Sequence, residues 1–435
     1  MVVDAQISLT GCGRPLPFWA LPGALAADIA GGPAKPPAFA FDARRNACAL
    51  TGLAPASIAA ATAAAIGDAV RPVAFADLFL FSRAGTATYL ASDGTIRTAA
   101  ADTARFDWSN GSRQLLVEAQ VANLLLQSRN LAASPWTAVD MAAVRGQPSL
   151  FGDGDAFRLT GASTDARYSQ SVSVTSGQTY CFWAWMKPGT AAQSRLRAYD
   201  GANAAGYEIT VSWASRTAAS TGSGSATPFV TAFPGGYYRV GFSFAPAGTA
   251  LQLQLFSGAG TVDFDGAQLE SGLSPSSYVP TTTASVTRSG DVCRFSPAGE
   301  AVLQRAAAGV VIRGQGMRGA FGAIVGGTAM SRLVGFNSTQ NSIVFGASSI
   351  VTLASAAAPL PPFGVAAAWN GSGKAGCYNG ATVQNTAVAL DTTLTKSYLG
   401  RAESGNVSSG HYDFIALYPF RMADAALPAK AVAHL

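Results

Sequence analysis

The feature that most constrains the fold of this chain is a series of short segments in which apolar and polar residues alternate. Between residues 123 and 280 these segments recur at roughly ten-residue spacing and are separated by Gly- and Pro-containing turns. A period of two belongs to a β-strand, whose successive side chains point to opposite faces of a sheet. The expected strands are residues 156–160, 167–174, 178–187, 194–199, 208–213, 236–245, 251–257 and 261–270. Strands this short and this numerous predict a β-sandwich over residues 123–285.

A second series of strand-like segments occupies residues 293–435. The expected strands are residues 308–314, 321–325, 331–337, 342–346, 350–354, 364–369, 376–378, 396–400 and 412–420. Asn379-Gly380 has the composition of a hairpin turn, and residues 424–434 are expected to form a final helix. The Thr- and Ser-rich residues 281–292 are expected to link the two series along the surface. The sequence therefore predicts a second sandwich over residues 293–435.

Residues 1–122 have a weaker pattern, and we expect them to form a separate N-terminal region. Residues 2–9 alternate like one strand, and Ser57 is placed to cap an Ala-rich helix that ends near residue 70. Residues 81–110 combine strand-like runs with tight turns, including a hairpin turn at residues 92–94. The predicted class is mainly β, with this region followed by two sandwiches.

Composition and charge exclude several classes of partner. Charged residues make up 12% of the chain, whereas about 25% is usual for soluble proteins. The net charge is +5 over 435 residues, and no run of Lys or Arg is present, so we expect no nucleic-acid partner. The uncharged residues 46–67 are mostly Ala and are broken by Gly52 and Pro55, so we expect no membrane insertion. The N-terminus has no pattern of a signal peptide, which favours synthesis in the cytoplasm.

Cysteine and histidine usage gives no sign of a disulfide framework or a zinc site. The five cysteines are scattered and form no CxxC pair, and there are only two histidines. Buried free thiols are the expected state. The residues are Cys12, Cys48, Cys181, Cys293, Cys377, His411 and His434.

Two parts of the sequence resemble components of bacteriophage particles. Residues 81–108, followed by LLVEAQVANLLLQSRN at 115–130, resemble a segment common in phage and prophage tail fibres and spikes. The closing phrase VDFDGAQLESGLSPSSYVPTT at 262–282 resembles the end of sugar-binding-like modules in the same proteins. This resemblance implies a virion or gene-transfer-agent protein, made in the bacterial cytoplasm, whose N-terminal region binds other virion proteins. It also implies a homo-oligomer, for which a trimer is one option.

The two predicted sandwiches carry resemblances of their own. YSQSVSVTSGQTYCFWAWMK at 168–187 and GGYYRVGFSF at 235–244 resemble strands of carbohydrate-binding jelly rolls. VAAAWNGSGKAGCYNGATVQ at 365–384, with the C-terminal residues 396–429, resembles the closing half of concanavalin-A-like or laminin-G-like sandwiches. The first resemblance implies sugar binding by the middle module. The second implies a fold only, because the acidic and asparagine ligands of lectins do not carry over.

The candidate sugar-binding residues are aromatic, because a sugar ring stacks its C–H face on an aromatic plane. Trp183 and Trp185 point to one face of their strand, and Phe182 and Ala184 point to the other. The alternative for each tryptophan is the sandwich core, where aromatic side chains are commonly buried. The candidates are Trp183, Trp185, Trp213, Tyr237 and Tyr238, with Tyr199 and Tyr207 as weaker ones.

One pair of carboxylates is a candidate for a structural calcium ion. Asp263 and Asp265 flank Phe264 and point to the same face of one strand. Jelly rolls of the resembled kind often hold calcium near their last strand, and two carboxylates supply part of such a site. The alternative is a polar face of an edge strand. No other cofactor is expected.

The sequence predicts that the chain is not an enzyme. A glycosidase needs two carboxyl groups flanking its substrate, and a serine hydrolase needs a GxSxG turn with a matching His. Gly222-Ser223-Gly224-Ser225 lacks the surrounding strand and helix, and the glutamates are few: Glu118, Glu208, Glu270, Glu300 and Glu403. The leading hypothesis is a fibre or spike that binds host surface polysaccharide for adsorption. The alternatives are a virion connector or decoration protein without glycan binding, and a glycan-cleaving enzyme.

Overall fold

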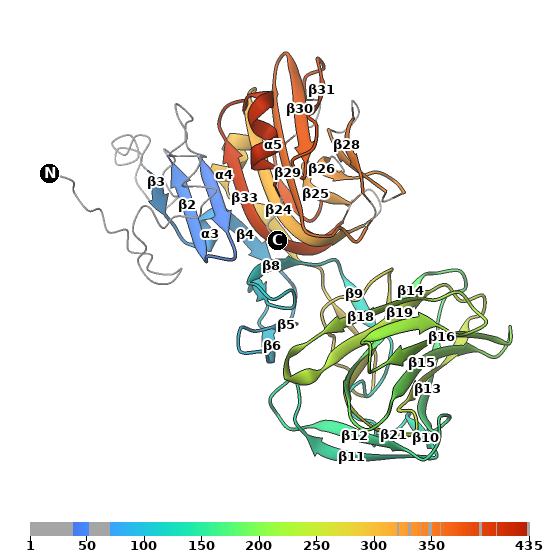
Figure 1. Cartoon of the computed structure of the whole chain (residues 1–435). Helices are drawn as coiled ribbons and strands as arrows, with labels where there is room; N and C mark the ends of the chain where they lie inside the picture. Colours follow the sequence, from blue (N-terminus) through green and yellow to red (C-terminus); the bar gives the residue numbers. More distant parts are fainter. Residues whose placement is uncertain are drawn as a thin grey trace. The chain divides into compact units, whose positions relative to one another are not determined.

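The computed structural model describes most of the chain outside its N-terminal part. The described residues are 38–51, 70–319, 322–328, 332–339, 341–346, 350–356, 358–390, 394–405 and 407–432. The strand expected at 2–9, Cys12 and His434 lie outside them, as does the helix expected at 57–70 except for Val70, which begins a strand. Within the described residues the protein is mainly β, as predicted, and it divides into two compact units (Figure 1). Unit 1 contains residues 1–84, 101–119 and 290–435, and unit 2 contains residues 85–100 and 120–289.

Unit 2 is a β-sandwich of two six-stranded sheets. The first sheet has the order β10 (Thr137–Val139), β13 (Arg167–Ser173), β20 (Ala250–Phe256), β15 (Gln193–Asp200), β16 (Ala205–Ser212) and β17 (Thr217–Ser220). The second has the order β11 (Met141–Gln147), β12 (Ala156–Gly161), β21 (Gly260–Ser271), β14 (Tyr180–Pro188), β19 (Tyr238–Phe244) and β18 (Thr227–Ala232). The chain passes repeatedly from one sheet to the other, as in jelly rolls.

Alternation along each strand builds the core of unit 2. Phe182, Ala184 and Met186 of β14 meet Leu251, Leu253 and Leu255 of β20 in one buried cluster. Short elements complete the unit: β5 (Ala87–Leu90) with β6 (Ile96–Ala99), β9 (Val121–Asn123) with β22 (Val286–Arg288), and a 3-10 turn at Pro234–Gly236. The predicted linker at 281–292 therefore contains one short strand, β22, which pairs with β9.

Unit 1 also consists of two sheets. The larger has the order β3 (Val70–Pro72), β2 (Ala47–Thr51), β1 (Phe39–Asp42), β33 (Ser409–Tyr418), β24 (Ala308–Arg318), β29 (Phe363–Asn370), β30 (Gly373–Tyr378) and β31 (Gln384–Thr386). β8 (Gln114–Val117) pairs with β33 and with β7 (Arg105–Asp107). The smaller has the order β28 (Val351–Ser355), β27 (Ser342–Phe345), β26 (Arg332–Phe336), β25 (Ala323–Gly326), β32 (Tyr398–Leu399), β23 (Val292–Phe295) and β4 (Phe79–Ser82).

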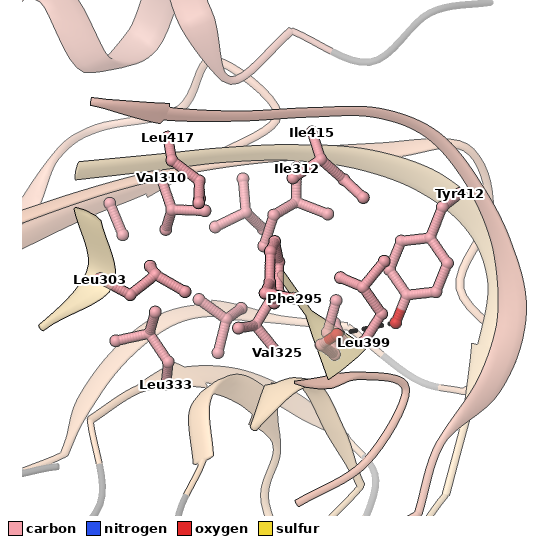
Figure 2. Close-up of a cluster of buried hydrophobic side chains, with 14 of the residues drawn as sticks. Phe295, Leu303, Val310, Ile312, Val325, Leu333, Leu399, Tyr412, Ile415 and Leu417 are labelled. Carbon is pink, nitrogen blue, oxygen red and sulfur yellow. Dashed lines mark hydrogen bonds between the residues drawn. The ribbon is translucent and has the colours of Figure 1, made fainter. Parts of the chain in front are cut away.

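Apolar side chains of both sheets fill the space between them. Figure 2 shows Val310 and Ile312 of β24 facing Val325 of β25 and Leu333 of β26. Tyr412 of β33 is fully buried there, and its hydroxyl donates to the Ile324 carbonyl at 2.7 Å. The outer face of the larger sheet carries an Ala-rich cluster that includes Leu427 of α5 (Leu427–Lys430). Two other short helices are α3 (Phe75–Leu78) and α4 (Pro297–Leu303).

The predicted strands of both sandwiches are confirmed, with shifts of a few residues at their ends. The Asn379-Gly380 turn is also confirmed: both residues have positive φ, and the Ala381 amide donates to the Tyr378 carbonyl at 3.0 Å. The expected final helix is shorter than predicted, with a 3-10 turn at Asp424–Ala426 followed by α5. Cys48, Cys181, Cys293 and Cys377 are buried thiols outside any disulfide, as expected.

The expected N-terminal region of residues 1–122 is divided between the two units. β1 pairs with β33 near the C-terminus, and β4 pairs with β23, so both belong to unit 1. Residues 85–100, by contrast, belong to unit 2. All four residues of β1 are buried, and this segment completes a core instead of forming one of its own. The expected role of this region in particle attachment stays a prediction.

A buried ion cluster in unit 1 joins segments that are far apart in sequence. The Arg105 guanidinium contacts Glu118 at 2.9 Å and Asp291 at 2.5 Å, and Arg83 contacts Asp291 at 3.1 Å. The Glu118 amide also donates to Asp291 at 2.9 Å. These residues lie next to the positions at which the chain passes between units 1 and 2. Burial lowers the pKa of Arg105, but Glu118 and Asp291 raise it more, so its charged form is maintained.

Candidate functional site

Trp183 and Trp185, the leading sugar-stacking candidates, lie on the outer side of β14 and are buried. Their exposed fractions are 0% and 2%. The two rings are 5.0 Å apart, and the Tyr278 ring lies 6.0 Å from Trp183 and 5.1 Å from Trp185. The Trp183 indole N–H donates to Glu270 at 2.8 Å. Loop residues therefore cover this face of the sheet, and the expectation of an open aromatic platform at Trp183 and Trp185 is wrong.

Local sequence explains how the Trp183 side chain is accommodated on this face. Gly241 of β19 lies directly opposite Trp183 in the register of β14 and β19. A Cβ atom at position 241 would lie 2.5 Å from the Trp183 Cβ, so only glycine fits there without movement. The Arg239 guanidinium, on the same strand as Gly241, lies 5.5 Å from the Trp183 ring. The cluster is therefore held by packing and by charge over an aromatic ring.

Of the other three aromatic candidates, two are buried and one is half-buried. Tyr237 is 2% exposed, and its hydroxyl donates to the Pro148 carbonyl at 2.7 Å. Trp213 is 4% exposed and donates its indole N–H to the Ser194 hydroxyl at 2.9 Å in the sandwich core. Neither can stack on a sugar, so these two expectations are also wrong. Tyr238 is half-buried, 6.0 Å from the Trp213 ring, and the Arg216 guanidinium lies 5.1 Å from its ring.

Asp263 and Asp265 share one face of β21, as predicted, but both are paired with arginines. Asp263 accepts from the Arg158 Nε at 2.8 Å, and Asp265 accepts from Arg129 at 2.7 Å and from the Leu150 amide at 2.5 Å. The described residues contain no group of three or more His, Cys, Asp or Glu placed to hold a metal ion. Two carboxylates already neutralised by guanidinium groups do not fit the ligand set of a calcium ion. The structure therefore does not support the prediction that this pair binds a calcium ion.

The Asp265 ion pair has a structural role in unit 2. Arg129 also contacts Asp153 at 2.8 Å, and its guanidinium lies 3.8 Å from the Phe151 ring. The Phe151 ring packs 5.9 Å from Trp185. Burial raises the pKa of the Asp265 carboxyl to about 6, and Arg129 acts against that rise. The pair thus holds the loop that covers the tryptophans.

The opposite sheet of unit 2 presents an open polar surface, which we name the outer polar face. It consists of Arg195, Arg197 and Tyr199 of β15, Glu208 of β16, and Gln252 and Gln254 of β20. On the same strands Leu196, Ile209 and Leu253 point into the core. The residues between these core positions, which form the outer polar face, therefore point outward. Tyr199, Gln252 and the two arginines are half-buried, whereas Glu208 and Gln254 are buried between them.

Charges and amides on the outer polar face are arranged in short contacts. Arg195 contacts Asp165 at 2.6 Å and Glu208 at 3.4 Å, and Arg197 lies 3.8 Å from Glu208. The Arg197 guanidinium is 4.8 Å from the Tyr199 ring. The Gln254 amide donates to Gln252 at 2.5 Å. Amide, guanidinium and tyrosine groups on adjacent strands are groups that can bind a hydroxyl-rich ligand.

Sequence reasoning identified only Tyr199 on this face, and only as a weaker candidate. The signal was present in the alternation Arg195-x-Arg197-x-Tyr199 and Gln252-x-Gln254. A long polar side chain at every second position indicates a solvated sheet face. What the sequence could not show is that β15 and β20 are neighbours, which brings the two rows together.

A serine, an aspartate and a histidine lie close together in unit 1. Ser109 and Asp107 both contact His411, at 3.4 and 3.2 Å, but both contacts are to the same ring nitrogen, Nε2. A serine nucleophile and an orienting carboxylate need different ring nitrogens, so this trio is not a hydrolase triad. Glu270 and Glu300 are each bonded to buried neighbours. The expectation that the chain is not an enzyme stays a prediction.

Helices in the described part of the chain are all too short or too polar to cross a membrane. No family model matches the chain, and no curated protein matches it.

Solved structures that match include two proteins with CBM22 modules. One is the CBM22-1–GH10 part of endo-1,4-β-D-xylanase 10B from Clostridium thermocellum, complexed with xylohexaose, with 11% identity and a TM-score of 0.23. That match covers 37% of this chain and 29% of the xylanase chain, so the chain spans less than a third of that structure. The other is the CBM22-1–CBM22-2 tandem of Paenibacillus barcinonensis Xyn10C, with 11% identity and a TM-score of 0.25. It covers 68% of this chain and 97% of the tandem. The sheets described above, and not these matches, assign the protein to the mainly β class with two sandwich units.

Proposed function

We propose that this chain is a non-catalytic glycan-binding protein and that the outer polar face of unit 2 binds the glycan. The observation that carries the proposal is the side-by-side placement of Arg197, Tyr199, Gln252 and Gln254 on two adjacent strands. Amides and guanidinium groups bind sugar hydroxyls, and a tyrosine ring packs against sugar C–H groups. The covered tryptophans of the opposite sheet have no part in binding.

Binding of the purified protein to insoluble polysaccharides and to extracted bacterial surface polysaccharide tests the proposal. Tyr199→Ala is expected to weaken binding by roughly two- to tenfold, since an aromatic contact contributes about 0.5–1.5 kcal/mol. Tyr89→Ala is the matched control, because Tyr89 is a half-buried tyrosine in β5 of the same unit, outside the outer polar face. Equal weakening by both variants, or no binding by the wild type, contradicts the proposal.

We further propose that the glycan is a host surface polysaccharide and that the chain acts on a phage or phage-derived particle. The support is the resemblance of residues 80–130 and 262–282 to segments of tail fibres and spikes. Mass spectrometry of purified particles and adsorption assays with Tyr199→Ala test this role. Presence in particles together with binding to their proteins, but not to cells, would favour the connector function instead. Sedimentation would establish whether the chain forms the expected oligomer.

A further inference from the structure

The centre of the outer polar face is formed by a directly opposed pair of residues. Arg197 of β15 and Gln254 of β20 are partners in the antiparallel register, and both point outward. Side chains opposed in this way start about 5 Å apart at Cβ. Arg197 is also opposite Glu208 on its other side, in β16. Gln254 therefore lies beside a guanidinium group that a carboxylate partly neutralises.

Two polar atoms of this pair have no hydrogen-bond partner among the described residues. They are the acceptor Gln254 Oε1 and the donor Arg197 Nε, whose closest carboxylate oxygen, on Glu208, is 3.8 Å away. Gln254 is only 4% exposed, so its oxygen is also shielded from solvent. Leaving such a group unsatisfied costs about 1–3 kcal/mol. A ligand that binds at such a place can supply the missing partner.

Charge on this face argues for a neutral ligand. Arg195 is paired with Asp165 and Glu208, and Arg197 faces Glu208, so neither arginine offers an unopposed positive charge. Glu208, whose side chain is 11% exposed, would repel a carboxylate or sulfate brought close to it. A ligand with hydroxyl groups avoids that repulsion and can still satisfy both atoms.

We infer, on the basis of the glycan-binding function proposed above, that Gln254 and Arg197 bind the adjacent hydroxyls of a neutral sugar residue beside Tyr199. One hydroxyl donates to Gln254 Oε1, and its neighbour accepts from Arg197 Nε. A hydroxyl both donates and accepts, so it serves either orientation of the glutamine amide. The Arg197 side chain, 34% exposed, is the group that moves to admit the sugar.

The ligand side of the inference is tested with a defined panel of polymers. Dextran, mannan, galactan and xylan are the neutral members, and polygalacturonate is the anionic one. Binding to at least one neutral polymer, and weaker or no binding to polygalacturonate, is expected. Periodate oxidation followed by borohydride reduction cleaves the bond between carbons that carry adjacent hydroxyls, and it should abolish binding of the polymer that bound before treatment.

The protein side is tested with Gln254→Met, which keeps the size and removes both the acceptor and the amide that donates to Gln252. Affinity for the bound neutral polymer is expected to fall about tenfold, as for the loss of one well-placed hydrogen bond. The melting temperature of the free protein should fall little, because Gln254 Oε1 has no partner within unit 2 and the bond that is lost there is the one that the Gln254 amide donates to Gln252. Gln147→Met in β11, in the other sheet, is the matched control and should change neither quantity.

The outcomes separate this inference from the function on which it rests. Binding neither to these polymers nor to extracted bacterial surface polysaccharide overturns both. Preference for polygalacturonate, binding that survives periodate treatment, or unchanged affinity of Gln254→Met overturns the adjacent-hydroxyl inference while glycan binding stands. A lower melting temperature for Gln254→Met with unchanged affinity would assign Gln254 a structural role and also contradict the inference.

Discussion

The indole of Trp183 contacts four side chains of unit 2. Trp185 and Tyr278 pack against it, the Arg239 guanidinium lies 5.5 Å from its ring, and Glu270 accepts its N–H. A ring with such surroundings acts on stability. Binding is instead expected to depend on the residues that line the outer polar face of unit 2.

Trp183→Ala is expected to destabilise unit 2 without acting on binding directly. The free energy of unfolding should fall by about 3–5 kcal/mol, because the substitution leaves a cavity and removes one of the donors to Glu270. Denaturant unfolding measures the effect, and glycan binding is measured under conditions in which the variant remains folded. Trp183→Phe is the control and should lose less. Lost binding at unchanged stability would show that the ring is reachable by ligand.

Calcium is expected to have no effect on stability through Asp263 and Asp265. Both carboxylates are already paired with Arg158 and Arg129. EDTA and added calcium should therefore leave the melting temperature unchanged. A melting temperature that rises with calcium, and no longer does so in Asp263→Asn, would restore the calcium site that the sequence suggested.

At the scale of elements, strands from distant parts of the sequence pair with one another in the same sheet. β1 joins the larger sheet of unit 1 through β33, and β7 and β8 join it through the same strand. The cluster of Arg83, Arg105, Glu118 and Asp291 ties β4, β7, β8 and the segment before β23 together in the unit 1 interior. The run LLVE at 115–118 therefore supplies apolar residues to the core and, in Glu118, a partner for a buried guanidinium group.

Asp291→Ala is expected to lower the stability of unit 1 by about 3–5 kcal/mol, because it leaves two buried guanidinium groups with too few partners. Asp263→Ala in unit 2 is the control, since it removes a partner of Arg158, whose side chain is 48% exposed. That pair should contribute less than about 1 kcal/mol. Thermal unfolding of both variants measures the difference, and equal losses would contradict the buried cluster.

At the scale of the whole molecule, two separate cores predict two unfolding events. Unit 1 and unit 2 each have their own buried cluster between two sheets. Calorimetry of the full chain should show two transitions, one shifted down by Asp291→Ala and the other by Trp183→Ala. The unshifted transition in each variant is its internal control. A single transition that both variants shift would contradict independent cores.

The sequence by itself determined where most strands of both sandwiches lie. Strands such as β14, β15, β20 and β24 follow from period-two alternation, which is a local property of the chain. The Asn379-Gly380 turn likewise follows from the residues that tolerate positive φ. These features need no knowledge of distant neighbours, so a reading of neighbouring residues was enough to predict them.

Only the tertiary structure decided which strand faces are open. Alternation shows that a strand has two different faces, but not what covers each. The outer face of β14 is closed by Phe151 and Tyr278, from loops far away in sequence, which buries Trp183 and Trp185. The outer face of β15 and β20 stays partly exposed at residues such as Arg197 and Tyr199, and the pairing of the two strands places Arg197 beside Gln254. Contacts between distant segments depend on the whole chain, and for that reason the site lies where local patterns did not place it.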